Sequence, residues 1–277
     1  MVYLLFAILS SALISVFMRS SEQRITHNIG MLAVNYLVCL ILSAFYTNTH
    51  QFFPQTQGLI VSLILGIVSG ILYLAAFVLM QWNVSHNGVV LSATFMKLGV
   101  LVPTAMSVLV FREVPTAFQV LGFFGALAAI LLINTGAACT IQNRGALLLL
   151  LLGGGLTDAM SKIYEELGPS SASNQFLFWT FLTALFLCLC LILIKRQSVR
   201  LPDILFGLLI GIPNYYSTRF LLLALNSVPA VVAYPTYSVS TIVCATAAGV
   251  LLFREALDRR RICALMLILI SLVFLNL

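Results

Sequence analysis

Charged residues are scarce in this chain. Lys and Arg number 14 and Asp and Glu number 8 among 277 residues, which is 8%, against about 25% in a soluble domain. Hydrophobic residues make up 61%, so the chain cannot cover itself with a polar surface and a soluble globular protein is excluded. The formal charge of +6 is scattered through short connections. Because no single basic patch results, we expect no nucleic-acid partner.

Several chemical signatures are also missing. The six cysteines lack metal-ligand spacing and five lie inside apolar runs, so we expect buried thiols and neither a metal nor a cofactor. No GxxxxGK[ST] segment is present to bind ATP. The apolar spans lack a second aspartate for an aspartyl protease, a Ser/His pair and a metal-binding helix. An intramembrane enzyme is therefore a remote alternative, and we expect the protein not to be an enzyme.

Long apolar runs, in contrast, fill the chain. A bilayer core about 30 Å thick requires roughly 20 apolar residues per helix. On that measure the sequence predicts an all-α integral membrane protein with ten transmembrane helices, with the first run interpreted as a mature helix and not a signal peptide. The predicted spans are about 2–18, 30–46, 58–80, 88–111, 117–135, 145–163, 174–194, 204–225, 230–253 and 260–277.

The fourth and ninth spans repeat each other. The segment from Val89 to Glu113 matches the segment from Val231 to Glu255 at a constant offset of 142, and both end in Phe-Arg-Glu. Weaker matches extend the similarity, so residues 1–140 and 141–277 are predicted to be two five-helix repeats. Because five is odd, the second repeat enters the membrane from the opposite side. Inverted repeats are typical of secondary transporters with a site near the midplane.

This pattern resembles the drug/metabolite transporter superfamily, specifically its EamA-type ten-helix members. The two five-helix repeats, the Glu-containing turns at Glu113 and Glu255, and the Gly-rich fifth span carry the resemblance, which covers essentially the whole chain. It implies helices arranged around a central cavity, lined mainly by spans 1, 3, 4, 6, 8 and 9, with spans 5 and 10 peripheral.

Loop charges predict the orientation in a cell (inner or plasma) membrane. Ten basic residues belong to the loops of one face, and Arg112 and Lys162 belong to the other. Basic residues in short loops stay cytoplasmic, so both termini are predicted outside. Both termini inside is the alternative that the family resemblance implies.

Three ionisable residues lie well within predicted spans, where a charge usually faces a cavity or a partner. From the helical rise, Lys97 is about 14 Å, Asp158 about 20 Å and Arg219 about 22 Å from the same face. Asp158 either pairs with Lys162 one turn on or faces Arg219 or a substrate cation. Arg219 in turn either lines the cavity or snorkels to the nearby interface.

Lys97 is placed too deep to snorkel easily. Thr94, Lys97 and Thr104 share one face of the fourth span, and the ninth span has Val239 where the lysine would be. A polar face shared by both repeats would line a common cavity, and the lysine favours an anionic or carbonyl-bearing solute. The alternative is a lysine held by backbone carbonyls for helix packing.

Polar aromatic residues complete the predicted cavity and suit a flat or zwitterionic solute. Pro213 and Pro235 are expected to interrupt the eighth and ninth spans. Glu113 and Glu255 are interpreted as charges at the N-terminus of the helix that follows each, and not as proton sites. The cavity residues predicted besides Lys97 are Thr94, Asp158, Arg219, Tyr73, Asn214, Tyr234 and Tyr237.

The sequence therefore predicts a secondary transporter that moves a small organic solute by alternating access. Proton coupling through Asp158 and facilitated diffusion both stay open, as do monomer and dimer. A lipid flippase, which needs a groove open to lipid, and a passive channel, which needs far faster flux, are the alternative functions.

Overall fold

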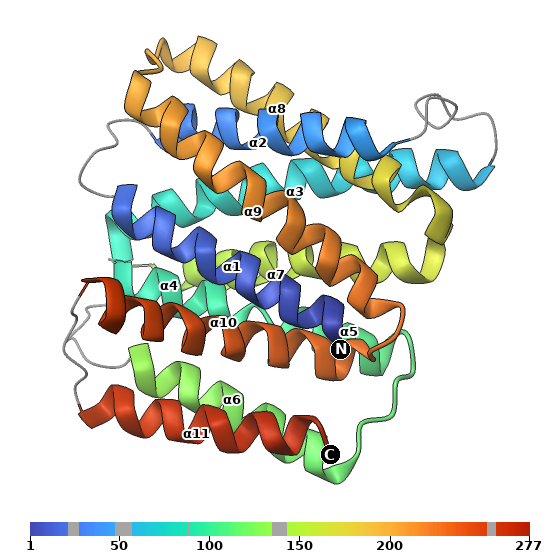
Figure 1. Cartoon of the computed structure of the whole chain (residues 1–277), viewed down its shortest axis with the longest axis vertical. Helices are drawn as coiled ribbons and strands as arrows, with labels where there is room; N and C mark the ends of the chain where they lie inside the picture. The colour runs from blue at the N-terminus through green and yellow to red at the C-terminus, as the bar shows by residue number, and fades with distance from the viewer. Residues whose placement is uncertain (22–27, 48–56, 88, 135–142, 254–258) are drawn as a thin grey trace. The chain divides into compact units, whose positions relative to one another are not determined.

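The structure is a computed structural model that describes residues 1–21, 28–47, 57–87, 89–134, 143–253 and 259–277. Its regular elements in these ranges are helices (Figure 1). In chain order they are α1 (Val2–Ser21), α2 (Asn28–Tyr46), α3 (Gln57–Asn87), α4 (Val89–Leu98), α5 (Leu101–Leu109), α6 (Ala117–Asn134), α7 (Arg144–Leu167), the 3-10 turn η2 (Ser170–Ala172), α8 (Ser173–Lys195), α9 (Leu201–Leu225), α10 (Ala230–Phe253) and α11 (Arg259–Leu275).

These helices confirm the predicted all-α membrane fold. Within the described ranges, eight segments are long and apolar enough to cross a membrane, and two shorter apolar helices, Ala117–Leu132 and Ile262–Leu275, bring the number to ten. Most predicted boundaries lie within three residues of the observed ones. The third span is an exception, because its helix continues to Asn87, seven residues beyond the predicted end.

The chain divides into two compact units. Unit 1 consists of residues 1–74 and 163–224, and unit 2 of residues 75–162 and 225–277. Each unit thus combines segments from both predicted repeats. Glu255 lies outside the described residues.

In unit 1, α2 packs against both α8 and α9 (Figure 1). Glycines on α9 make the second contact close. A Cβ atom at Gly207 would lie 2.7 Å from the Met31 carbonyl oxygen, and one at Gly211 would lie 3.0 Å from that of Asn35. Small residues allow this approach between membrane helices.

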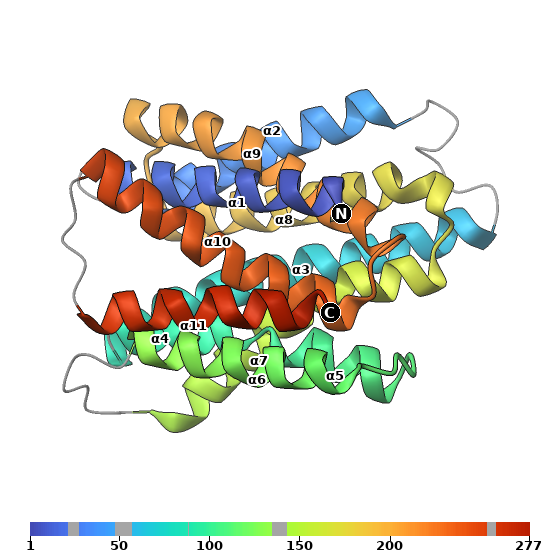
Figure 2. The ribbon, with the colours of Figure 1, turned by 60° about the horizontal axis from the view of Figure 1, so that its bottom comes forward.

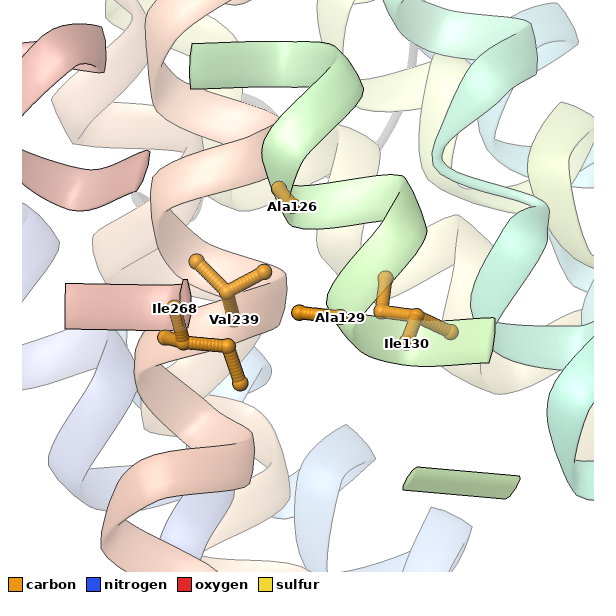
Figure 3. Close-up of a cluster of buried hydrophobic side chains, with 5 residues drawn as sticks. All are labelled: Ala126, Ala129, Ile130, Val239 and Ile268. Atoms are coloured by element: carbon orange, nitrogen blue, oxygen red, sulfur yellow. The ribbon is translucent and has the colours of Figure 1, made fainter. Parts of the chain in front are cut away.

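In unit 2, α6 lies along α11, and α10 contacts both (Figure 2). A buried apolar cluster fills the junction of these three helices (Figure 3). Spans at equivalent positions of the predicted repeats thus pack together, the fifth on the tenth here and the second on the seventh in unit 1. The cluster consists of Ala126, Ala129, Ile130, Val239 and Ile268.

The predicted fourth span is two helices. α4 ends at Leu98 and α5 begins at Leu101, with a turn at Gly99 and Val100. Pro103 explains the break, because proline has no N–H to donate to the Gly99 carbonyl and its ring crowds that oxygen. The Gly99 carbonyl instead accepts a hydrogen bond from the Val102 amide at 2.9 Å.

The prolines named from the sequence do not break their helices. α9 continues through Pro213 and α10 through Pro235. The expectation that Pro213 and Pro235 interrupt the eighth and ninth spans is therefore wrong. The interrupted span is the fourth, between Leu98 and Leu101.

Candidate functional site

Lys97 lies in the last turn of α4, one residue before the helix ends. Its side chain is exposed, yet surrounding protein desolvates it strongly. Asp158, in α7, has the same combination of exposure and desolvation. Both side chains are thus accessible although protein surrounds them, which makes them candidates for the lining of a cavity.

A glycine contact places the break in the fourth span directly against α7. A Cβ atom at Gly99 would lie 3.0 Å from the Gly155 nitrogen, and one at Gly155 would overlap the Gly99 carbonyl oxygen. Asp158 follows Gly155 by three residues, which is about one turn. The contact of these glycines thus brings the two charged helix segments together.

The charges of Lys97 and Asp158 interact electrostatically. In the part of the chain that the structure describes, no ion pair within 4.0 Å joins the two side chains. The two opposite charges therefore attract each other without direct contact.

α10 provides the third side of this site. The Tyr234 hydroxyl donates a hydrogen bond of 2.9 Å to the Asp158 carbonyl oxygen. Tyr234 is buried, Tyr237 is half-buried, and Thr94 on α4 is buried. The buried Thr236 hydroxyl has no hydrogen-bond partner among the described residues. Unit 2 thus contains five of the predicted cavity residues: Lys97, Thr94, Asp158, Tyr234 and Tyr237.

Val239 does not belong to this site. It is fully buried in the cluster with α6 and α11 (Figure 3). The ninth span was predicted to share a polar face with the fourth, but at the position equivalent to Lys97 it contributes a side chain to the apolar core. The two repeats therefore differ at this position, with a charged residue in the first and a buried apolar residue in the second.

Lys162 pairs with Glu113, and not with Asp158. Its Nζ lies 3.0 Å from the Glu113 carboxylate and 5.6 Å from the Phe111 ring centroid. The i,i+4 pairing suggested for Asp158 and Lys162 is thus not the ion pair that forms.

Glu113 binds the first turn of α10. Its carboxylate accepts hydrogen bonds from the Ala230 amide at 3.1 Å and the Val231 amide at 2.9 Å. Burial alone would raise the pKa of Glu113, but these two amides and Lys162 outweigh it and hold the pKa below its ordinary value. Glu113 lies at a helix N-terminus, but the predicted helix was wrong: its carboxylate binds α10 and not α6, the helix that follows directly.

Unit 1 contains the three other predicted cavity residues, Tyr73, Asn214 and Arg219. The Asn214 side-chain amide donates to the Asn35 side-chain oxygen at 3.2 Å, which links α9 to α2. The Arg219 guanidinium stacks on the Tyr46 ring, 3.8 Å from its centroid. Tyr73 makes edge contacts with other aromatic rings of the unit.

Sequence reasoning missed Tyr46 as a partner of Arg219. The signal was available in part, because Tyr46 ends a predicted span and aromatic residues are common at such ends. No spacing rule connects two residues that lie 173 positions apart, however.

Comparison with known proteins agrees with this fold. The sequence model of the "EamA-like transporter family" matches residues 144–277, and that family belongs to the drug/metabolite transporter superfamily. An uncharacterized protein of Haemophilus influenzae (strain ATCC 51907 / DSM 11121 / KW20 / Rd) is 22% identical over 270 residues, covering 92% of this chain and 91% of the relative. A crystal structure of a protein has a TM-score of 0.74 at 13% identity, covering 99% of this chain and 94% of that one.

Proposed function

We propose that this chain, of which residues 144–277 match the EamA-like transporter family, is a multi-pass transporter of the drug/metabolite transporter superfamily and acts as a secondary carrier for a small organic solute with an anionic or carbonyl group. The solute binds between Lys97 and Asp158, and alternating access exposes this site to each side of the membrane in turn. The two five-helix repeats are inverted, and both termini lie outside the cell membrane. Packing between equivalent helices supports the repeats, and the loop charges support the orientation.

The proposal rests on the electrostatic interaction of Lys97 with Asp158, two opposite charges within unit 2. Opposite charges inside a membrane protein are costly unless they are paired or hydrated. These two attract each other without forming an ion pair, and both are exposed while enclosed by protein. A solute with a negative or carbonyl oxygen would satisfy the lysine, and its donor groups, or a proton, would satisfy the aspartate.

The helix break supplies a further reason for a site here. Discontinuous membrane helices expose backbone groups at their ends, and transporters use such ends to bind solutes or ions. Lys97 stands in the last turn before the break at Gly99 and Val100. The last turn of a helix is a position that favours a cation, because the unpaired backbone carbonyls of that turn carry partial negative charge.

The experiment is uptake into proteoliposomes. A thermal-shift screen of purified protein against a metabolite panel identifies a solute, because a ligand that binds the folded state raises its melting temperature. Uptake of that solute is then measured for wild type, Lys97→Ala and Lys195→Ala. Lys195 is an exposed lysine at the end of α8 and is the matched control.

We expect Lys97→Ala to abolish uptake while its chromatographic profile stays normal, and Lys195→Ala to transport as wild type does. Full transport by Lys97→Ala would remove the lysine from the mechanism. Flux that is too fast for a carrier cycle and shows no saturation would assign a channel instead.

A further inference from the structure

Arg219 lies in a membrane-spanning helix, and no carboxylate among the described residues pairs with it. No ion pair within 4.0 Å joins it to an acidic residue in the described ranges of the chain. Its side chain is half-buried on α9, two turns before that helix ends at Leu225. An arginine in such a position is costly unless an anion, water or an aromatic face offsets the charge.

The aromatic face is Tyr46. The guanidinium lies 3.8 Å from the centroid of this ring. The ring also stacks with Tyr215, parallel to within 9° at a centroid distance of 6.1 Å. Stacking of this kind engages the π face of the guanidinium. The Tyr46 and Tyr215 hydroxyls lie within hydrogen-bonding reach of Arg219, but a guanidinium has five N–H donors, so two such partners leave donors for a ligand. Those donors form a fork that fits two oxygens of a carboxylate or phosphate.

The surroundings hold this stack in one geometry. The hydroxyls of Tyr46 and Tyr216 lie 3.2 Å apart, and Tyr216 stacks on Phe220, which contacts Phe6 of α1. The Asn174 side chain also donates to the Tyr46 carbonyl at 2.8 Å. Four helices of unit 1 therefore fix the arginine, which reduces the entropy lost when a ligand binds.

Tyr46 lies off the most exposed stripe of α2. That stripe consists of Leu37, Ile41 and Phe45, which are 43%, 59% and 83% exposed and recur every four residues. Tyr46 is one residue further, about 100° around the helix. Tyr46 is itself 37% exposed, so its contacts with Tyr215 and Tyr216 on α9 connect it to unit 1 while part of its surface stays accessible to a ligand.

We propose that Arg219, Tyr46 and Tyr216 form an oxyanion-binding subsite in unit 1, separate from Lys97, that binds the carboxylate of a planar organic acid. The guanidinium edge binds the two oxygens, and the tyrosines provide a flat wall for the rest of the molecule. This inference rests on the proposed carrier function and extends it, since it gives the anionic solute a second binding position. The phosphate of an anionic lipid headgroup has the same chemistry and is the competing source.

Binding of benzoate to the purified full-length protein tests the subsite. Thermal shifts are recorded in nanodiscs of zwitterionic phosphatidylcholine, with benzoate as probe and benzamide as its neutral counterpart. The variants are Arg219→Gln, Arg219→Lys and Tyr46→Leu, with Arg196→Gln as control. Arg196 is an exposed arginine of the same unit, at the end of α8.

We expect benzoate, and not benzamide, to stabilise the wild type and the Arg196→Gln variant. Arg219→Gln weakens the apparent affinity by about 10- to 100-fold, as loss of hydrogen bonds to a charged group predicts. Arg219→Lys and Tyr46→Leu weaken it by about tenfold or less, because each keeps part of the site. An unchanged benzoate shift in Arg219→Gln, or an equal shift with benzamide, would overturn the proposal.

A second arm separates the lipid source. If a stabilisation that depends on Arg219 is seen only in nanodiscs containing phosphatidylglycerol, the subsite binds a lipid headgroup and the solute assignment is overturned. The Lys97→Ala variant distinguishes this subsite from the transport site. It retains its benzoate shift if the subsite is independent, even where uptake is lost. Loss of the shift in Lys97→Ala would show that benzoate binds at Lys97 and that the separate subsite does not exist.

Discussion

The carboxylate of Glu113 accepts a hydrogen bond of 2.9 Å from the backbone amide of Val231, although 118 residues separate the two in sequence. Glu113 follows α5, in the first predicted repeat, and Val231 stands in the first turn of α10, in the second. Lys162 on α7, five residues before that helix ends, binds the same carboxylate. One acidic side chain thus joins three segments of unit 2.

Replacing this carboxylate should weaken unit 2. Glu113→Gln removes the charge that binds Lys162 and leaves an NH2 group facing one of two helix amides. We expect the free energy of unfolding to fall by about 1–3 kcal/mol, the range for hydrogen bonds to a charged group. Thermal unfolding in detergent measures this loss. Glu166→Gln, an exposed acid of α7, should change the melting temperature little.

The lowered pKa of Glu113 also predicts a pH dependence. A carboxyl whose pKa is depressed in the folded state stabilises the protein above its unfolded pKa, and this stability is lost as pH falls through the folded value. The melting temperature of the wild type should therefore fall as pH decreases below about 4.5. In Glu113→Gln this part of the decrease is absent. Parallel curves for both proteins would contradict the assignment.

The crossing of Gly99 and Gly155 should tolerate no side chain. In Gly155→Ala the new Cβ atom would overlap the Gly99 carbonyl and lie 2.5 Å from a Val102 methyl carbon. We expect α7 to move away from the break, with reduced uptake and a lower melting temperature. Gly145→Ala, in the first turn of the same helix, meets only a side-chain oxygen at 3.6 Å. Uptake by this control should match the wild type.

Asp158 is the carboxylate best placed for proton coupling. Under that mechanism, Asp158→Asn loses uptake driven by a pH gradient but retains exchange of solute across the membrane, because exchange moves no net proton. Proteoliposome assays with and without an imposed gradient separate the two activities. Gradient-driven uptake that persists in Asp158→Asn would assign the protein to facilitated diffusion or to another proton site.

The helices could be predicted from sequence because apolar length is a local property. The break in the fourth span was also encoded locally, by Gly99 followed by Pro103, but equally suggestive prolines at 213 and 235 stand inside continuous helices. A proline removes one hydrogen bond wherever it occurs. Whether the helix then breaks depends on its neighbours, and here Gly155 lies directly against the turn.

The partners of charged residues were harder to predict. Lys162 has Asp158 one turn away, so the sequence suggested that pair, but the structure brings Glu113 closer from a distant segment. Val239 showed the converse problem. Its position in the repeat matches Lys97, yet packing against α6 and α11 makes it core. Tertiary neighbours, which no helical spacing reveals, decided both cases.

The central claim is that Lys97 faces a water-filled opening, and labelling of a cysteine at position 97 tests it most directly. Lys97→Cys and Leu121→Cys are made in a background without native cysteines, and membranes are treated with a charged, impermeant thiol reagent. Leu121 is 60% exposed on α6, on the stripe with Phe118 and Phe124, where we expect lipid. The account predicts that Cys at 97 is labelled and that transported solute protects it, while Cys at 121 stays unlabelled. Equal resistance at both positions would place residue 97 against lipid or in packed protein and contradict the account.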